Sequence, residues 1–179
     1  MRCFIAINLP DEIKAYLEDI ILKLEVKNRH QEIKWTEAEN LHLTLGFIEE
    51  IDEATLDKLR LDMSGLVIPQ DFFLCLGKLG VFPNEQSPRV IKINLADTGN
   101  KIATIIAFIK KIFVKYNIPI DEHPFNPHIT VGRVKRPGVY LRLEQSIKPI
   151  SFAVNSIDLM QSELTSTGPI YSLLKSFHS

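Results

Sequence analysis

Apolar residues recur along the chain with two periods, one typical of strands and one typical of helices. Residues 90–95 alternate apolar and polar positions, as a strand with one buried face does. Residues 13–24 instead place apolar side chains every three or four positions, which is one stripe of an amphipathic helix. By these patterns we expect strands over 2–9, 33–35, 41–47, 72–79, 90–95, 128–134, 150–159 and 171–177.

Residues that favour helix ends predict where the helices begin. Pro10 suits the first turn of the helix after the first strand, and Asp11 and Glu12 favour its positive end. Asp52 is a candidate cap for a second helix, and a third helix is expected over 100–116. The buried stripe of the second helix should consist of Leu56, Leu59 and Met63.

An internal repeat emerges when the chain is compared with itself at a shift of 86 residues. The sequence HLTLG at 42–46 then falls on HITVG at 128–132. The same shift aligns the first strand with the strand over 90–95 at the residue pairs Ile5/Ile91, Ile7/Ile93, Asn8/Asn94 and Leu9/Leu95. A fixed shift that matches two separate segments indicates a duplication and two lobes related by a pseudo-twofold axis.

The expected fold class is therefore α+β, in one bilobal domain over 1–179. Strands that alternate with helices also occur in parallel sheets. The short strands and the strand-only region near the C-terminus favour an antiparallel sheet with outer helices in each lobe. A groove between the lobes would then hold the functional site.

Composition and charge restrict the class of protein. Of the 179 residues 45% are apolar and 24% are charged, which is typical of a globular protein. A net charge of −1 argues against a broad basic surface for long duplexes, but a local positive pocket for a nucleic-acid end remains compatible with it. There is no signal-peptide pattern and no membrane-length apolar run, and Cys3 and Cys75 read as reduced, buried thiols. We expect a cytoplasmic protein.

The repeated motif places chemically useful groups on one face of each strand. Because strand side chains alternate, His42 and Thr44 should share a face, with the apolar neighbours on the other side. His128 and Thr130 should do the same in the second half. By the same alternation Gly46 and its equivalent glycine should lie on the His/Thr face and leave room for a ligand.

Two imidazoles and two hydroxyls that converge on one centre suit a phosphodiester. Histidine has an ordinary pKa of about 6.5, so near pH 7 one ring can act as an acid and the other as a base. Threonine hydroxyls can donate to the non-bridging oxygens, where charge accumulates. Neither a metal nor a cofactor is required for this chemistry.

Two other interpretations of the motif are less favoured. A single His-x-Thr on a strand would more often be a surface histidine than a catalytic one, and only the second copy reverses that preference. A structural zinc site would need about four ligands, whereas His42 and His128 supply two, and no other ligand type recurs with them.

At these motifs the chain resembles the two-histidine phosphoesterase superfamily and, more narrowly, the RNA 2′,3′-cyclic phosphodiesterases, also described as 2′-5′ RNA ligases. The resemblance covers nearly the whole chain and includes 2–10, 35–47, 80–84, 88–90, 125–133, 162–165 and 168–171. It implies a bilobal fold and hydrolysis of an RNA-terminal 2′,3′-cyclic phosphate to a 2′-phosphomonoester. It also implies His42 as general acid, His128 as general base, and Thr44 and Thr130 as phosphate ligands.

Arg133 matches an arginine that follows the second motif in this family and is expected to contact the substrate phosphate. Simple alternation would place Arg133 opposite His128, so a bulge or strand end at Gly132 would have to turn it back. Phe47 occupies the equivalent place in the first half, and we interpret it as a core residue in preference to a base-stacking one.

Other functions remain open at this point. The same acid/base pair could join RNA ends through a 2′-5′ bond by the reverse reaction, or the fold could bind RNA ends without turnover. The partners expected are RNA ends or oligonucleotides with a 2′,3′-cyclic phosphate, and no membrane. The natural RNA and the oligomeric state are open, with a monomer as the working expectation.

Overall fold

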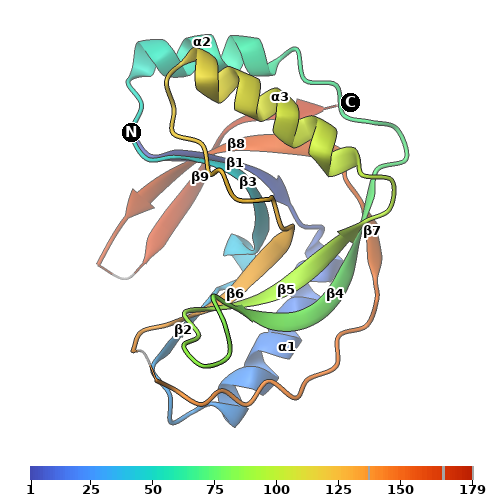
Figure 1. Ribbon diagram of the computed structural model, residues 1–179, viewed down its shortest axis with the longest axis vertical. Coiled ribbons are helices and arrows are strands. Elements are labelled where there is room, and N and C mark those ends of the chain that lie inside the picture. The colour runs from blue at the N-terminus through green and yellow to red at the C-terminus, as the bar shows by residue number, and fades with distance from the viewer. Residues whose placement is uncertain (137, 167, 179) are drawn as a thin grey trace.

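The computed structural model describes residues 1–136, 138–166 and 168–178 (Figure 1). Its elements in chain order are β1 (Cys3–Asn8), α1 (Asp11–Lys27), β2 (Ile33–Trp35), the 3₁₀ helix η1 (Ala38–Asn40), β3 (His42–Ile48), α2 (Glu53–Met63), β4 (Phe73–Phe82), β5 (Val90–Asp97), α3 (Lys101–Lys115), β6 (His128–Val134), β7 (Ser151–Ala153), β8 (Ser156–Leu164) and β9 (Pro169–His178). Each predicted helix is present, close to its expected bounds. The strand expected over 150–159 is divided into β7 and β8, because β7 pairs with β4 whereas β8 pairs with β1.

Local residue chemistry accounts for the helix starts. Pro10 immediately precedes α1, and Asp11 and Glu12 lie in its first turn, where carboxylates interact favourably with the helix dipole. Asp52 caps α2 as predicted, since its side chain accepts a hydrogen bond of 2.9 Å from the backbone N–H of Thr55. Leu56, Leu59 and Met63 of α2 are buried, as their spacing predicted.

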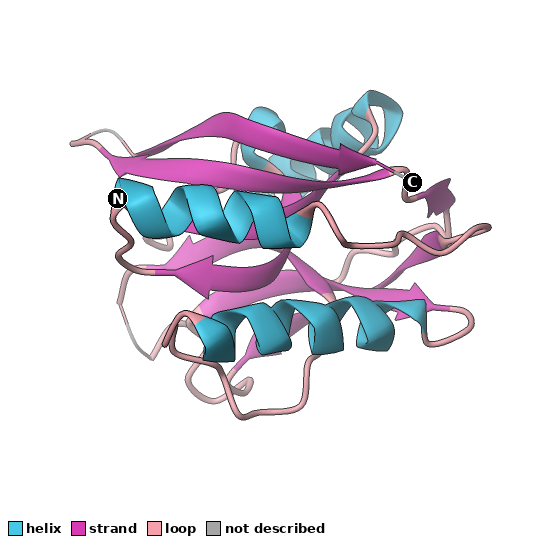
Figure 2. Ribbon diagram, turned by 90° about the horizontal axis from the view of Figure 1, so that it is seen from above, coloured by secondary structure: helices cyan, strands magenta, loops and turns pink. Residues whose placement is uncertain are grey.

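The strands form one curled antiparallel sheet in the order β7-β4-β5-β6-β3-β1-β8-β9, with β2 added to β6. Between the two expected halves, β3 and β6 share one residue pair, Leu43 and Ile129, and β2 of the first half also pairs with β6. Helices α2 and α3 contact each other at one end of the molecule, and α1 lies at the other (Figure 1). Seen from above, the front helices run in about the same direction as the strands (Figure 2). The predicted α+β fold with antiparallel pairing is confirmed.

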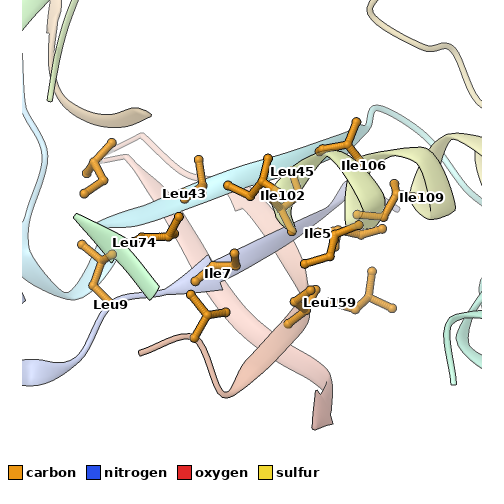
Figure 3. Packing of buried hydrophobic residues seen from close by; sticks show 14 of the residues in the cluster. Ile5, Ile7, Leu9, Leu43, Leu45, Leu74, Ile102, Ile106, Ile109 and Leu159 are labelled. Atoms are coloured by element: carbon orange, nitrogen blue, oxygen red, sulfur yellow. The ribbon is translucent and has the colours of Figure 1, made fainter. Parts of the chain in front are cut away.

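One hydrophobic core runs through both halves. Ile5 and Ile7 of β1, Leu43 and Leu45 of β3 and Ile109 of α3 are among its buried members (Figure 3). In β3 these core residues alternate with His42 and Thr44, which line a cavity on the opposite face of the sheet, and Phe4 of β1 lines the same cavity. The helices therefore cover one face, and the other is left for a site.

The pairing register repeats between the halves. In β1 and β3, Asn8 lies opposite His42 and Ile5 lies opposite Gly46, and between these pairs the register shifts by one residue at a bulge. Strands β5 and β6 repeat the same partners 86 residues later, including the bulge: Asn94 with His128 and Ile91 with Gly132. We propose that the two halves descend from one duplicated unit within a single domain.

Two further expectations concern the thiols and the membrane. Cys3 is buried as expected, whereas Cys75 is only half-buried, and both are free thiols. Among the described residues, no helix has both the length and the apolar character that a bilayer crossing demands.

Candidate active site

The two motif histidines begin strands β3 and β6 and line one cavity of about 600 Å³ on the concave face of the sheet. Thr44, Thr130 and Arg133 line the same cavity. All five residues that the sequence analysis selected thus lie together, although they come from segments far apart in the chain. Among the described residues, no three His, Cys, Asp or Glu side chains are grouped so as to hold a metal ion.

Both imidazole rings are held in the same way. Nδ1 of His42 lies 2.7 Å from the carbonyl oxygen of Asn40, and Nδ1 of His128 lies 2.8 Å from that of Asn126. A carbonyl oxygen only accepts hydrogen bonds, so Nδ1 carries a proton in each ring. This fixes the tautomer and leaves Nε2 of both rings as the atom that can accept or deliver a proton.

The surroundings of the two rings differ. His42 stacks on Phe4, with ring centroids 4.8 Å apart, and Tyr171 meets it edge-on at 5.5 Å. Its Nε2 lies 3.0 Å from Oγ1 of Thr44, whose hydroxyl donates to the neutral ring. The hydrogen bond of His128 is exposed to solvent, and its Nε2 has no hydrogen-bond partner within the described part of the chain.

Burial lowers the pKa of His42, because a charged imidazolium loses hydration in this covered position. The hydrogen bond to the Asn40 carbonyl acts in the opposite direction, and the positive charges of Lys14 and Arg133 lower the pKa further. An anion bound between these groups would reverse the effect of the cations. The free site therefore favours the neutral ring, and an anion bound beside it would favour the charged one.

The bulges in β3 and β6 correct the expectation that Gly46 and Gly132 face the ligand. A Cβ on Gly46 would lie only 2.8 Å from Cζ of Phe113, which belongs to the core, and one on Gly132 would lie 3.0 Å from the Trp35 ring. The extra bulge residue turns each glycine away from the His/Thr face. These glycines allow close packing and do not shape the groove.

The same bulges return the residues after the glycines to the groove. Arg133 lines the cavity, which is the result expected if a bulge turns its side chain back to the face of His128. Phe47 lines it as well and is 40% exposed, so its interpretation as a core residue was wrong. Alternation failed at both positions because a bulge depends on pairing with another strand, which the motif itself does not reveal.

Several groove residues lie outside the repeated motif. Phe4 and Tyr171 enclose His42, and Arg2 lies over the ring of Phe47, with Cζ 5.0 Å from the ring centroid. Lys34 enters the cavity from β2, directly opposite Arg133 in the ladder. None of these residues falls on a residue of the same type at the shift of 86, so the internal repeat did not indicate that they belong to the site.

Comparisons with known proteins show relatives over nearly the whole length of the chain. The sequence profile of the family described as LigT like Phosphoesterase matches residues 7–92 and 95–171. The RNA 2′,3′-cyclic phosphodiesterase of Thermotoga maritima is 34% identical over 97% of this chain and 93% of its own length. The enzyme of the same name from Methanocaldococcus jannaschii is also 34% identical, over 98% of this chain and 99% of its own length.

Solved structures with the same fold are also similar. The protein TT0787 of Thermus thermophilus superposes with a TM-score of 0.86 at 29% sequence identity, covering 99% of this chain and 97% of that one. The fold of Escherichia coli LigT complexed with 3′-AMP superposes with a TM-score of 0.78 at 24% identity, over 99% of this chain and 97% of that one.

Proposed function

Because this chain belongs to the LigT-like phosphoesterases, we propose that it hydrolyses the 2′,3′-cyclic phosphate at the end of an RNA to a 2′-phosphomonoester. The observation that carries the proposal is the matched pair of imidazoles on one cavity, each with Nδ1 held by a backbone carbonyl. Such a pair supplies an acid and a base without a metal ion.

In the proposed reaction His128 is the general base and His42 is the general acid. Nε2 of His128 takes a proton from water as its oxygen attacks phosphorus. The bond from phosphorus to the 3′ oxygen breaks, and that oxygen takes the proton from Nε2 of His42. Solvent access at His128 supports its role next to water, and the covered position of His42 supports a role toward the bound nucleoside.

The protonation states follow from the substrate's own charge. A cyclic phosphodiester is an anion, so its binding beside His42 and Arg133 raises the pKa of His42 from the lowered value of the free site. The acid is thereby charged when substrate is present. This makes the assignment of His42 as acid compatible with its neutral state in the empty groove.

Thr44, Thr130 and Arg133 are proposed to hold the phosphate. Their hydroxyl and guanidinium groups line the same cavity as the two rings and can donate to the non-bridging oxygens. In this arrangement they stabilise the charge that develops at phosphorus. We further propose a cytoplasmic, monomeric enzyme, in keeping with the two free thiols.

Turnover of 2′,3′-cyclic nucleotides in the presence of EDTA tests the proposal. The expected product is a 2′-phosphate, identified by phosphorus NMR or by co-elution with standards. Activity that EDTA abolishes and zinc restores would contradict metal-free catalysis. A 3′-phosphate product would show that the 2′ oxygen leaves instead.

Substitution of the two histidines tests the paired mechanism. His42→Ala and His128→Ala should each lower kcat by about 10²- to 10⁴-fold, the usual contribution of a positioned acid or base. His178→Ala serves as a matched control, because that histidine is exposed on β9. Circular dichroism checks that each variant folds, and full activity in either active-site variant would refute the pair.

A further inference from the structure

The groove around the two histidines has ends of opposite charge. A cavity of about 310 Å³ beside His42 is lined by Glu37 and Glu39, and no Lys or Arg is among the described residues that line it. The larger cavity that contains both histidines is lined by three cations, Arg2, Lys34 and Arg133, and it shares Glu37 with the smaller cavity. An RNA strand carries one negative charge per nucleotide, so its phosphates are favoured at the basic end and disfavoured at the acidic one.

Arg2 is a cation without an ionic partner in the described part of the chain. Its Nε is buried and makes no hydrogen bond, and none of the carboxylates there pairs with its guanidinium. The group instead stacks over the exposed ring of Phe47 at 5.0 Å. Since no described carboxylate neutralises this guanidinium, an anionic ligand in the groove can pair with it.

Arg2 also supplies the first half with a guanidinium, which the repeated motif provides only in the second half. At the shift of 86 residues Phe47 corresponds to Arg133, so β3 offers a ring where β6 offers a guanidinium. Arg2, immediately before the neighbouring strand β1, brings a guanidinium to that place by stacking on the ring. The result is an aromatic surface and a cation side by side, which is the combination that binds single-stranded nucleic acid.

We infer that Arg2 and Phe47 form a binding site for a second nucleotide of the RNA, next to the site of the cyclic phosphate. Arg2 pairs with a phosphate of the chain, and a base stacks against Phe47. The inference rests on the proposed function and adds to it that an oligonucleotide is preferred over a cyclic mononucleotide. A cyclic mononucleotide lacks the additional phosphate and base, so it does not reach this site.

Kinetics of two substrates in three variants test the inference. Arg2→Ala and Phe47→Leu should each raise KM about tenfold for a trinucleotide that ends in a 2′,3′-cyclic phosphate, with kcat unchanged. KM for adenosine 2′,3′-cyclic phosphate should not change. Lys175→Ala is the matched control, because it removes a lysine that stacks on Phe177, and neither residue lines the groove.

Salt dependence separates a phosphate contact from a loss of packing. Arg2→Ala should reduce the slope of log KM against log salt by about 0.7 for the trinucleotide, as expected for one single-strand phosphate. Phe47→Leu should leave that slope unchanged. An equal rise of KM for both substrates, or no rise for either, would overturn the inference.

A direct measurement of binding tests the inference independently of catalytic activity. The dissociation constant of a trinucleotide 2′-phosphate, measured by fluorescence anisotropy, should rise about tenfold in Arg2→Ala relative to the unchanged protein. If no cyclic phosphate is hydrolysed, the proposed function fails, and this titration still decides whether the second site exists. If turnover is normal but neither assay separates the variant from the Lys175→Ala control, only the inference fails.

Discussion

At the scale of single residues, the two histidines show how one motif acquires two environments. Both rings are held through Nδ1 by the carbonyl two residues earlier, so the motif sets their tautomer. Phe4 and Tyr171 cover only His42, and these rings come from β1 and β9. The difference between the two ring environments, on which the proposed acid and base roles rest, therefore arises from neighbours outside the motif.

This difference between the two rings predicts a measurable shift in the pKa of His42. In the free protein its pKa should lie below the ordinary histidine value, because burial disfavours the charged ring. Inorganic phosphate should raise it, since a bound anion stabilises the imidazolium. NMR titration of the imidazole carbon-bound protons measures both values, with His42→Ala used to assign the resonance.

The covering rings provide the control for that titration. Tyr171→Ala removes one of the side chains that bury His42, so it should move the pKa of His42 back toward its ordinary value. An ordinary or raised pKa in the free protein, or no response to phosphate, would contradict the environment described for this ring.

At the scale of elements, the decisive feature is a bulge that β3 and β6 both contain. It turns Gly46 toward α3 and returns Phe47 to the groove. A bulge redirects the side chains that follow it, which is why such irregularities are frequent next to active sites. Without it, Arg133 would point to the opposite face of β6.

The packing of Gly46 predicts that Gly46→Ala destabilises the protein by about 1–3 kcal/mol, as overpacking of a core does. The added Cβ would meet Cζ of Phe113 at 2.8 Å, and Phe113 is buried. Urea unfolding followed by circular dichroism gives the free energy of unfolding. Gly80→Ala is the matched control in another strand, since its Cβ would meet nothing closer than 3.6 Å.

A double-mutant cycle sharpens this prediction. In a Phe113→Leu background, Gly46→Ala should cost less than it does in the natural sequence, because the smaller side chain leaves the space that Cβ needs. Equal costs in both backgrounds would show that the clash with Phe113 is not the cause.

At the scale of the whole molecule, two pseudo-equivalent halves share one core and one sheet. The strands β3 and β6 join at a single residue pair, but the buried cluster extends through both halves. The last two strands return to the first half, where β8 pairs with β1. The two halves are thus not independent units, although each contributes one histidine and one threonine to the groove.

We therefore expect one cooperative unfolding transition. Trp35 is the single tryptophan of the chain and lies in β2, which pairs with β6 of the second half. Its fluorescence should change at the same urea concentration as the helical circular dichroism signal, because a shared core unfolds as one unit. A fluorescence transition at clearly lower urea would show that the second half unfolds separately.

The sequence by itself determined the helices, most of the strands and the pair of histidines. These depend on local periods and on a repeat that any alignment of the chain with itself reveals, such as 42–46 on 128–132. Hydrophobic alternation is a local property of a strand, so it predicted which residues of β3 are buried as far as Leu45.

Only the tertiary structure decided what surrounds those histidines. The bulge that redirects Gly46 and Phe47 arises from pairing with β1, and the stacking of Arg2 on Phe47 joins β3 to the residue before β1. The covered state of His42 depends on Tyr171, which lies more than a hundred residues later in the chain. Contacts between distant segments leave no period in the sequence, so only the folded chain reveals them.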